Sequence, residues 1–318
     1  MGGYTAVRVR SAMVDAIPRK NPGKPLAFRP PEPALLVFTD LDGTLLDHHS
    51  YSFSAALPAL ERLRSLRVPV IPVTSKTLAE LAPLMRELDN PHPCIAENGG
   101  LIALPPTYFD ALDGYPLQEG YRVIELSSGY EDILHTARRL RAEHHYQFRG
   151  FSDMSNAEVA ACTGLSAAAA TRARRRLCSE PLLWLDTAAA FAQFRQALQS
   201  AGLQLLQGGR FWHLMGNHDK ASAMLRLCER YRGAGFQGFR TVALGDSPND
   251  IPMLEAVDIP MLIRRPEGGC VSLQRDRRAP CSELPGPAGW NHMMLTLLDA
   301  LTAAEPQFDP MAKGNRHG

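Results

Sequence analysis

The sequence has no cysteine pair at metal-binding spacing, no long apolar run and almost no net charge. Its six cysteines are scattered, so we expect free thiols of a reducing compartment and neither a disulfide framework nor a zinc site. No apolar stretch is long enough to cross a bilayer, and the N-terminus lacks the continuous apolar segment of a signal peptide. A formal net charge of +1 gives no electrostatic argument for binding nucleic acid or an anionic membrane. These absences predict a soluble cytoplasmic protein and leave its oligomeric state open.

The chain has 318 residues, enough for two domains, and 45% of them are hydrophobic, which allows a sizeable core. Residues 1–33 are rich in proline and have few periodic apolar positions, which predicts a flexible leader. We expect an α/β core domain in two parts, 34–102 and 207–303, interrupted by an α+β domain over 103–206. Residues 304–318 are expected to form a polar tail.

Short apolar runs alternate with helical patterns in both parts of the predicted core. Residues 35–38 have the length and side chains of a buried strand, and residues 54–67 carry leucines at helical spacing. Further strands are expected over 68–74, 93–96, 241–244 and 259–263, and further helices over 78–88, 221–231 and 290–301. In this order, the elements predict a parallel sheet covered by helices.

Two carboxylates, Asp40 and Asp42, directly follow the first predicted strand and precede Gly43. In an open parallel sheet, ligands bind beyond the carboxyl ends of the strands, where this pair is expected. Two acids so close together repel each other unless a cation or a proton compensates, which suits a metal ion and nucleophilic chemistry. An isolated pattern of this kind fits a turn after a strand equally well, so the other strand ends decide between the two interpretations.

The core carries further polar side chains at strand ends or helix starts: Thr74, Lys220, Asp246, Asn249 and Asp250. A phosphoryl-transfer site needs a nucleophile, a proton donor, a divalent cation and groups that hold the other phosphate oxygens. Asp40 and Asp246 can supply the oxygen ligands that Mg²⁺ prefers. Thr74 and Lys220 can hold phosphate oxygens, and Gly43 lets the backbone N–H groups around it approach a phosphate. The set therefore predicts a phosphate and magnesium site.

The motifs D-x-D-G-T at residues 40–44, Thr74, Lys220 and G-D-x-x-N-D at residues 245–250 resemble those of the haloacid dehalogenase-like (HAD) phosphatase superfamily. The resemblance implies a Rossmann-like core, an Asp40 nucleophile that forms an aspartyl-phosphate, and Asp42 as the general acid and base. It implies phosphate binding by Thr74 and Lys220, with Gly43 beside them. The implied Mg²⁺ site draws on Asp40, Asp42, Asp246, Asn249 and Asp250.

Three more motifs look like those of mannosyl-3-phosphoglycerate phosphatases: T-S-K-T at 74–77, E-N-G-G at 97–100 and G-G-R-F-W-H-L at 208–214. This resemblance covers about residues 35–265 and implies that the inserted domain is a type C2 cap. The implied reaction is hydrolysis of mannosyl-3-phosphoglycerate to mannosylglycerate, a compatible solute, and phosphate. The residues expected to contact the substrate are Ser75, Lys76, Asn98, Arg149 and Arg175. The chain departs from the family at Arg175-Arg176, where an Arg-Glu pair is expected, and this departure affects the sugar-acid contacts.

Two other functions stay open at this point. The core motifs contact only phosphate and metal, so they fit another HAD sugar phosphatase equally well, acting on glucosyl-3-phosphoglycerate, sucrose-phosphate or a hexose phosphate. A non-catalytic module that binds phosphorylated ligands is the alternative from a different class. The presence of both Asp40 and Asp42 argues against that module, and the cap must decide among the phosphatases.

Overall fold

The structure is a computed structural model that describes residues 34–208, 211–276 and 278–304. The predicted leader, and all but the first residue of the predicted tail, lie outside these ranges. Within them, no helix is both long enough and apolar enough to cross a membrane.

A five-stranded parallel sheet forms the centre of the core domain, in the strand order β13-β12-β11-β1-β2. Its strands are β1 (Leu35–Thr39), β2 (Val70–Pro72), β11 (Arg240–Gly245), β12 (Ile259–Arg264) and β13 (Cys281–Pro285). Strand β1 is buried along its whole length because it pairs with β11 on one side and with β2 on the other. Its unbroken apolar sequence is typical of such a central strand, and the predicted parallel sheet is confirmed.

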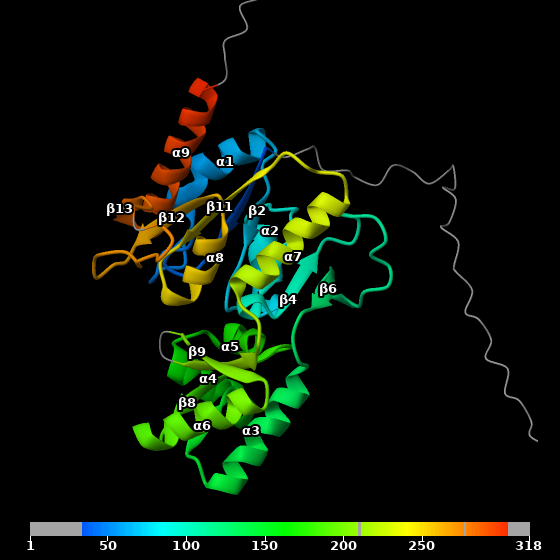
Figure 1. The fold of residues 1–318 in the computed structure, drawn as a ribbon, viewed down its shortest axis with the longest axis vertical. Helices are drawn as coiled ribbons and strands as arrows, with labels where there is room; N and C mark the ends of the chain where they lie inside the picture. Colours follow the sequence, from blue (N-terminus) through cyan, green and yellow to red (C-terminus); the bar gives the residue numbers. More distant parts are fainter. Residues whose placement is uncertain (1–33, 209–210, 277, 305–318) are drawn as a thin grey trace, which may run out of the picture.

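Helices cover both faces of this sheet (Figure 1). On one face lie α1 (Leu57–Ser65), α2 (Leu78–Glu87) and α9 (Gly286–Ala304), and on the other lie α7 (Lys220–Gly233) and α8 (Ile251–Ala256). Leu35 and Val37 of β1 belong to the hydrophobic cluster of the first face, whereas Leu36 and Phe38 belong to that of the second. Alternate side chains of one strand thus enter two separate clusters, which fixes the position of β1 between the helices.

A four-stranded antiparallel sheet continues the core next to β2, in the order β3-β4-β6-β5. Its strands are β3 (Cys94–Ala96), β4 (Leu101–Leu104), β5 (Leu117–Gln118) and β6 (Tyr121–Glu125). A parallel bridge between Val73 and Ile95 joins it to the central sheet. Strand β6 pairs with β4, so its predicted place in the inserted domain is wrong. An apolar run indicates a strand, but it does not indicate which strand becomes its partner.

The cap consists of another antiparallel sheet, in the order β7-β8-β10-β9, with helices packed around it (Figure 1). Its elements are α3 (Tyr130–His144), β7 (Phe148–Gly150), α4 (Asn156–Thr163), α5 (Ala167–Ala173), β8 (Ser179–Trp184), α6 (Ala188–Ser200), β9 (Leu203–Gln207) and β10 (Trp212–Gly216). Strand β10 pairs with both β8 and β9, so its predicted place in the core is wrong. We propose that the cap runs from residue 127 to residue 217.

Cys270 and Cys281 form a disulfide, which contradicts the prediction of six free thiols. Cys270 lies in the connection between β12 and β13, and Cys281 is the first residue of β13. The two cysteines are eleven positions apart in the sequence, a spacing that belongs to no metal-binding or redox motif. The bond depends on how this connection folds back onto the sheet, and the sequence pattern does not encode that.

Candidate active site

The turn after β1 is tied to the end of β11. Thr44 Oγ1 donates a hydrogen bond of 2.6 Å to Asp246 Oδ1. Gly43 has a φ of +82°, and a Cβ at this position would lie 2.8 Å from Asp246 Oδ2, so only glycine fits here without strain. The Gly43 N–H donates to Leu46 O at 2.9 Å, so this particular group is already engaged. Phosphate binding by the N–H groups around Gly43 stays a prediction, and the glycine brings the turn that carries Asp40 close to Asp246.

Lys220 is completely buried at the start of α7, where it forms ion pairs with two carboxylates. Its Nζ lies 2.5 Å from Asp40 Oδ1 and 2.6 Å from Asp250 Oδ1. Burial alone lowers the pKa of Lys220, but the two carboxylates outweigh burial and hold the pKa above its usual value. The other oxygen of Asp250 accepts hydrogen bonds from the N–H groups of Asp246 and Ser247. Lys220 is therefore a fixed positive charge beside Asp40, and Asp250 holds it there.

Carboxylate oxygens of Asp40, Asp246 and Asp250 lie within 4.8 Å of one another, and all three residues are buried. Burial, together with repulsion by Asp250, raises the pKa of Asp246 to about 6 and raises that of Asp40 well above its usual value. A divalent cation that accepts oxygen ligands relieves this repulsion, so the donor set fits Mg²⁺. The structure brings together three of the five predicted metal ligands, while Asp42 and Asn249 have other partners.

Asn249 and Asn98 connect the Asp246 loop to the turn after β3. Asn249 Nδ2 donates to Asn98 Oδ1 at 3.1 Å, and Asn249 Oδ1 accepts a hydrogen bond from Ser247 Oγ. Asn98 is completely buried, and its Nδ2 has no hydrogen-bond partner among the residues described. A buried donor without a partner costs free energy unless a ligand accepts its hydrogen bond. This arrangement supports the predicted contact between Asn98 and the substrate.

The segment that follows β2 lies beside Asp42. Thr74 is buried, and its Oγ1 accepts a hydrogen bond of 3.3 Å from the N–H of Lys76. Lys76 Nζ lies 2.8 Å from Asp42 Oδ2. Burial lowers the pKa of Lys76, but the carboxylate of Asp42 more than compensates and raises it. Asp42 Oδ1 is buried and has no hydrogen-bond partner within the described ranges, which leaves this oxygen for a ligand.

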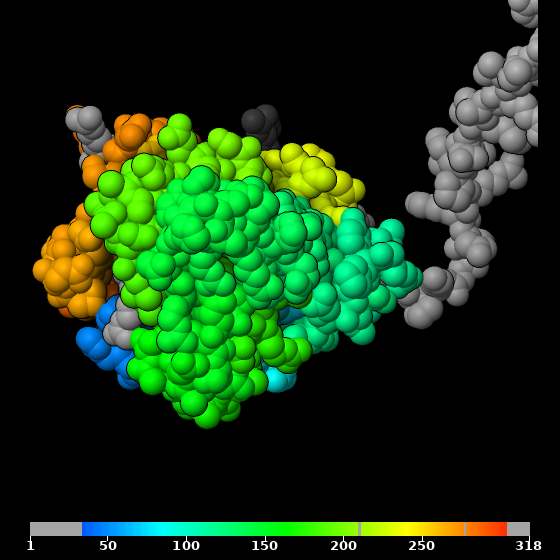
Figure 2. All heavy atoms as spheres, turned by 90° about the horizontal axis from the view of Figure 1, so that it is seen from below, coloured from blue at the N-terminus to red at the C-terminus, as the bar shows by residue number. Residues whose placement is uncertain are grey.

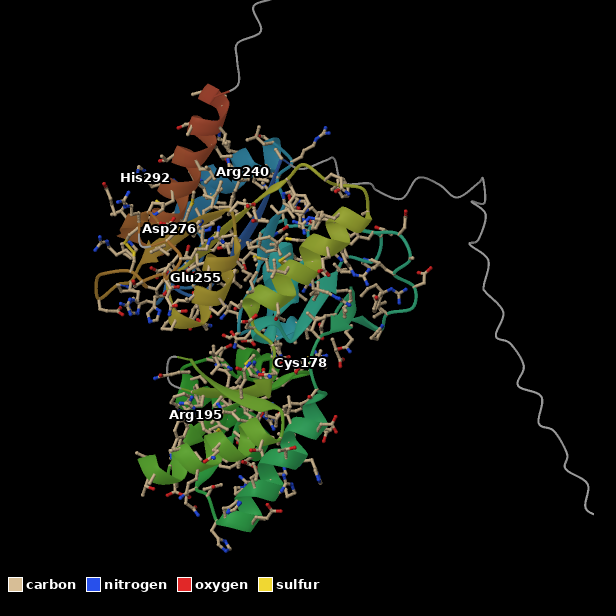
Figure 3. All side chains as sticks on the ribbon, in the orientation of Figure 1. Cys178, Arg195, Arg240, Glu255, Asp276 and His292 are labelled. Atoms are coloured by element: carbon tan, nitrogen blue, oxygen red, sulfur yellow. A yellow bond between two sulfur atoms is a disulfide. The ribbon has the colours of Figure 1, made fainter. Side chains whose placement is uncertain are left out.

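Glu97, at the start of the turn after β3, joins the core to the cap. Its carboxylate accepts hydrogen bonds from Leu177 N (2.8 Å), Cys178 N (3.0 Å) and Ser179 Oγ (2.7 Å). Figure 3 shows Cys178 at the junction of the two domains, and Figure 2 shows the cap in front of the core. Glu97 has a φ of +51°, an unusual conformation for a residue with a side chain, which is typical of functional sites. The buried carboxylate of Glu97 is thus one of the contacts that hold the cap over the core.

The cap arginines are not arranged as the sequence predicts. Arg175 is largely exposed and pairs with Glu119 of the core at 2.5 Å, and Arg149 is exposed and forms its ion pair inside the cap. The buried arginine is the neighbouring Arg176, which donates from Nη1 to Ser75 O at 2.9 Å. Sequence reasoning missed Arg176 because two adjacent arginines after a helix give no sign of which one turns inward. Neither Arg149 nor Arg175 contacts the acidic cluster in the described structure.

The sequence matches the family of haloacid dehalogenase-like hydrolases over residues 37–116 and 186–264. The chain belongs to this family. A relative from Methanococcoides burtonii, named glucosyl-3-phosphoglycerate/mannosyl-3-phosphoglycerate phosphatase, is 40% identical over 268 residues. The alignment covers 83% of this chain and 97% of the relative. On the strength of the HAD family and this relative, the protein is a phosphoric monoester hydrolase.

Solved HAD structures share the fold at lower sequence identity. A haloacid dehalogenase-like hydrolase from B. subtilis superposes with a TM-score of 0.57 at 17% identity, covering 83% of this chain and 99% of that one. A sugar phosphatase of HAD subclass IIB has a TM-score of 0.55 at 14% identity, covering 83% of this chain and 98% of its own. At these identities the comparison shows the fold, an α/β core with a cap, and confirms that prediction.

Proposed function

We propose that the protein hydrolyses mannosyl-3-phosphoglycerate to mannosylglycerate and phosphate, with Mg²⁺ as cofactor. The observation that carries this proposal is the 40% identity to an enzyme named for glucosyl- and mannosyl-3-phosphoglycerate. The alignment covers 83% of this chain, so the match includes the cap as well as the core. The core motifs do not distinguish the substrates of these phosphatases, so the cap must do so. Similarity to the relative within the cap therefore favours the glycosyl-phosphoglycerates over simple hexose phosphates.

In the proposed mechanism, Asp40 attacks the phosphorus atom and the bond to the sugar-acid oxygen breaks. Lys220 holds Asp40 Oδ1 at 2.5 Å and fixes the orientation of the nucleophile. Asp42 gives a proton to the leaving oxygen, and it then takes a proton from the water that hydrolyses the aspartyl-phosphate. Asp40 and Asp246, with Asp250 beside them, would hold Mg²⁺, and the ion would supply positive charge that stabilises the transferred phosphate.

Further groups are proposed to bind the phosphate and exclude water. Thr74 Oγ1 and Asn98 Nδ2 supply hydrogen bonds to phosphate or sugar oxygens. The contacts of Glu97 with the cap keep the cap over these groups and limit the access of bulk water to the intermediate.

Glucosyl-3-phosphoglycerate is the second candidate substrate, because the name of the relative includes it. The two sugars differ only in the configuration of one hydroxyl group, whereas the phosphoglycerate part is the same. Discrimination between them therefore rests on hydrogen bonds to that hydroxyl, which the core motifs do not touch.

The test is phosphate release from mannosyl-3-phosphoglycerate, glucosyl-3-phosphoglycerate, sucrose-6-phosphate and mannose-6-phosphate, each with Mg²⁺ and with EDTA. We expect the glycosyl-phosphoglycerates to exceed the other two in kcat/KM by ~100-fold or more, about 2.7 kcal/mol of transition-state binding. We also expect EDTA to abolish the activity and added Mg²⁺ to restore it. Similar kcat/KM values across the panel would reject the substrate assignment, and release unaffected by EDTA would reject the cofactor. A folded protein that releases no phosphate from any ester would favour the binding module.

A further inference from the structure

Lys76 lies in the segment that follows β2, and its ammonium group lies beside the carboxylate of Asp42. Its backbone is held on both sides, because its N–H donates to Thr74 Oγ1 and its carbonyl oxygen accepts from Glu97 N at 3.0 Å. The side chain is 17% exposed, and its Nζ lies 5.1 Å from the centre of the Tyr51 ring. The ammonium group is thus directed toward Asp42 and partly removed from water.

The stability of the fold gives little reason for a lysine at this position. Lys76 lies two residues before the first residue of α2, at the helix end where a positive charge is disfavoured. Its partner Asp42 has a side chain that is 36% exposed, and ion pairs with this exposure contribute little to folding free energy. A positive charge that is poorly placed for stability, and lies beside a proposed catalytic acid, is better explained by a negatively charged ligand.

The arginines of the cap described above, of which Arg149 and Arg175 were expected to bind this ligand, have other partners. Arg149 and Arg175 form ion pairs with Glu158 and Glu119, and Arg176 donates to a backbone oxygen of the core. Lys76 also has a partner, but an ammonium group has three N–H donors in a tetrahedral arrangement. It can therefore keep Asp42 and bind a second carboxylate at the same time.

We propose that Lys76 binds the carboxylate of the substrate and thereby selects phosphate monoesters that carry a carboxylate close to the phosphorylated carbon. This inference rests on the proposed function, in which Asp42 meets the oxygen that links phosphorus to the sugar acid. In a 3-phosphoglycerate unit, only two carbon atoms separate that oxygen from the carboxyl carbon. A cation 2.8 Å from Asp42 is therefore within reach of this carboxylate when the linking oxygen meets Asp42. A simple hexose phosphate has no carboxylate to form this ion pair.

The test compares each substrate with its methyl ester, in which the carboxylate charge is removed. The proteins are the unaltered chain, Lys76→Met and Lys76→Arg, and kcat/KM is measured with Mg²⁺ for mannosyl-3-phosphoglycerate and its ester. We expect the unaltered protein to prefer the acid over the ester by ~30-fold or more, the range of a hydrogen bond between charged groups. In Lys76→Met this preference should disappear, because kcat/KM falls for the acid and stays the same for the ester. Lys76→Arg should keep most of the preference. Arg195→Met, which removes an exposed positive charge on α6 of the cap (Figure 3), should leave the preference unchanged.

Equal losses on acid and ester in Lys76→Met would overturn the inference, because they would mean that Lys76 acts only through Asp42. An unaltered protein that hydrolyses acid and ester equally well would overturn it too. Failure of the proposed function looks different, since the unaltered protein would then hydrolyse mannosyl-3-phosphoglycerate no better than other esters. In that case the same comparison, made with 3-phosphoglycerate and its methyl ester, still shows whether Lys76 binds a carboxylate.

Discussion

Replacing Asp40 by asparagine is expected to lower the rate of phosphate release by ~10⁴-fold or more, since an amide is a very poor nucleophile. The structure indicates that this substitution removes the nucleophile and leaves the contacts around it in place. Asn retains an oxygen that accepts the hydrogen bond of Lys220, and Lys220 keeps its second partner, Asp250. The measurement is kcat on the best substrate of the panel, with enzyme at high enough concentration to detect the residual rate. Release within ~10-fold of the unaltered protein would reject Asp40 as the nucleophile.

The control for Asp40→Asn is its thermal stability. Burial and repulsion by Asp250 raise the pKa of Asp40 in the folded protein. A carboxyl group with a raised pKa stabilises the fold below its unfolded pKa and loses that contribution as the pH rises through the folded pKa. Without Mg²⁺, the charged form of Asp40 therefore costs stability as the pH rises, and the unfolding temperature of Asp40→Asn should increase relative to that of the unaltered protein over the same pH change. Asp47→Asn, a change at an acid of the same loop that lies outside the site, should retain activity within ~2-fold.

Lys220→Met is expected to reduce both activity and stability. Two carboxylates, Asp40 and Asp250, lose their common partner in a fully buried position, and breaking a buried ion pair in this way costs about 3–5 kcal/mol. Turnover should fall by ~10²- to 10³-fold, because the charge that orients the nucleophile is gone. The measurements are denaturant unfolding and kcat. Since Lys220 lowers the pKa of Asp40, its loss raises that pKa further, so the stability deficit should grow as the pH rises.

A double variant separates the missing charge from the missing volume. In Lys220→Met/Asp250→Asn one of the two carboxylates is neutral, so we expect a large part of the lost stability to return without return of activity. If the double variant is as unstable as Lys220→Met, the loss comes from packing of the methionine. An Lys220→Met protein with unchanged stability and turnover would show that the ion pairs with Asp40 and Asp250 are unimportant.

The parts of the site that the sequence predicts well are those where a motif adjoins the strand that positions it. Asp40 follows β1 directly and Asp246 follows β11 directly, so identifying the two strands was enough to bring the two acids together. The sequence also named Lys76 as a substrate contact; the structure places its Nζ 2.8 Å from Asp42 Oδ2, and the contact itself stays a prediction.

The parts that the sequence does not predict depend on pairing between distant segments. Strands β6 and β10 have ordinary apolar patterns, and only their partners place one in the core and the other in the cap. Arg176 is buried while Arg175 is exposed, although they are neighbours of the same type. The cause is the buried carboxylate of Glu97 and the oxygen of Ser75, which come from segments far away in the chain. Cys270 and Cys281 likewise meet through the path of a loop.

The central claim is that phosphate is transferred to Asp40 before it reaches water. The most direct measurement is acid quenching during the first turnover of a substrate labelled with ³²P, followed by digestion and identification of the labelled peptide. We expect a covalently bound phosphate, labile to hydroxylamine, on the peptide that contains Asp40, and no label in Asp40→Asn. Full turnover with no labelled protein at any quench time would contradict the account, because water would then attack the phosphate directly.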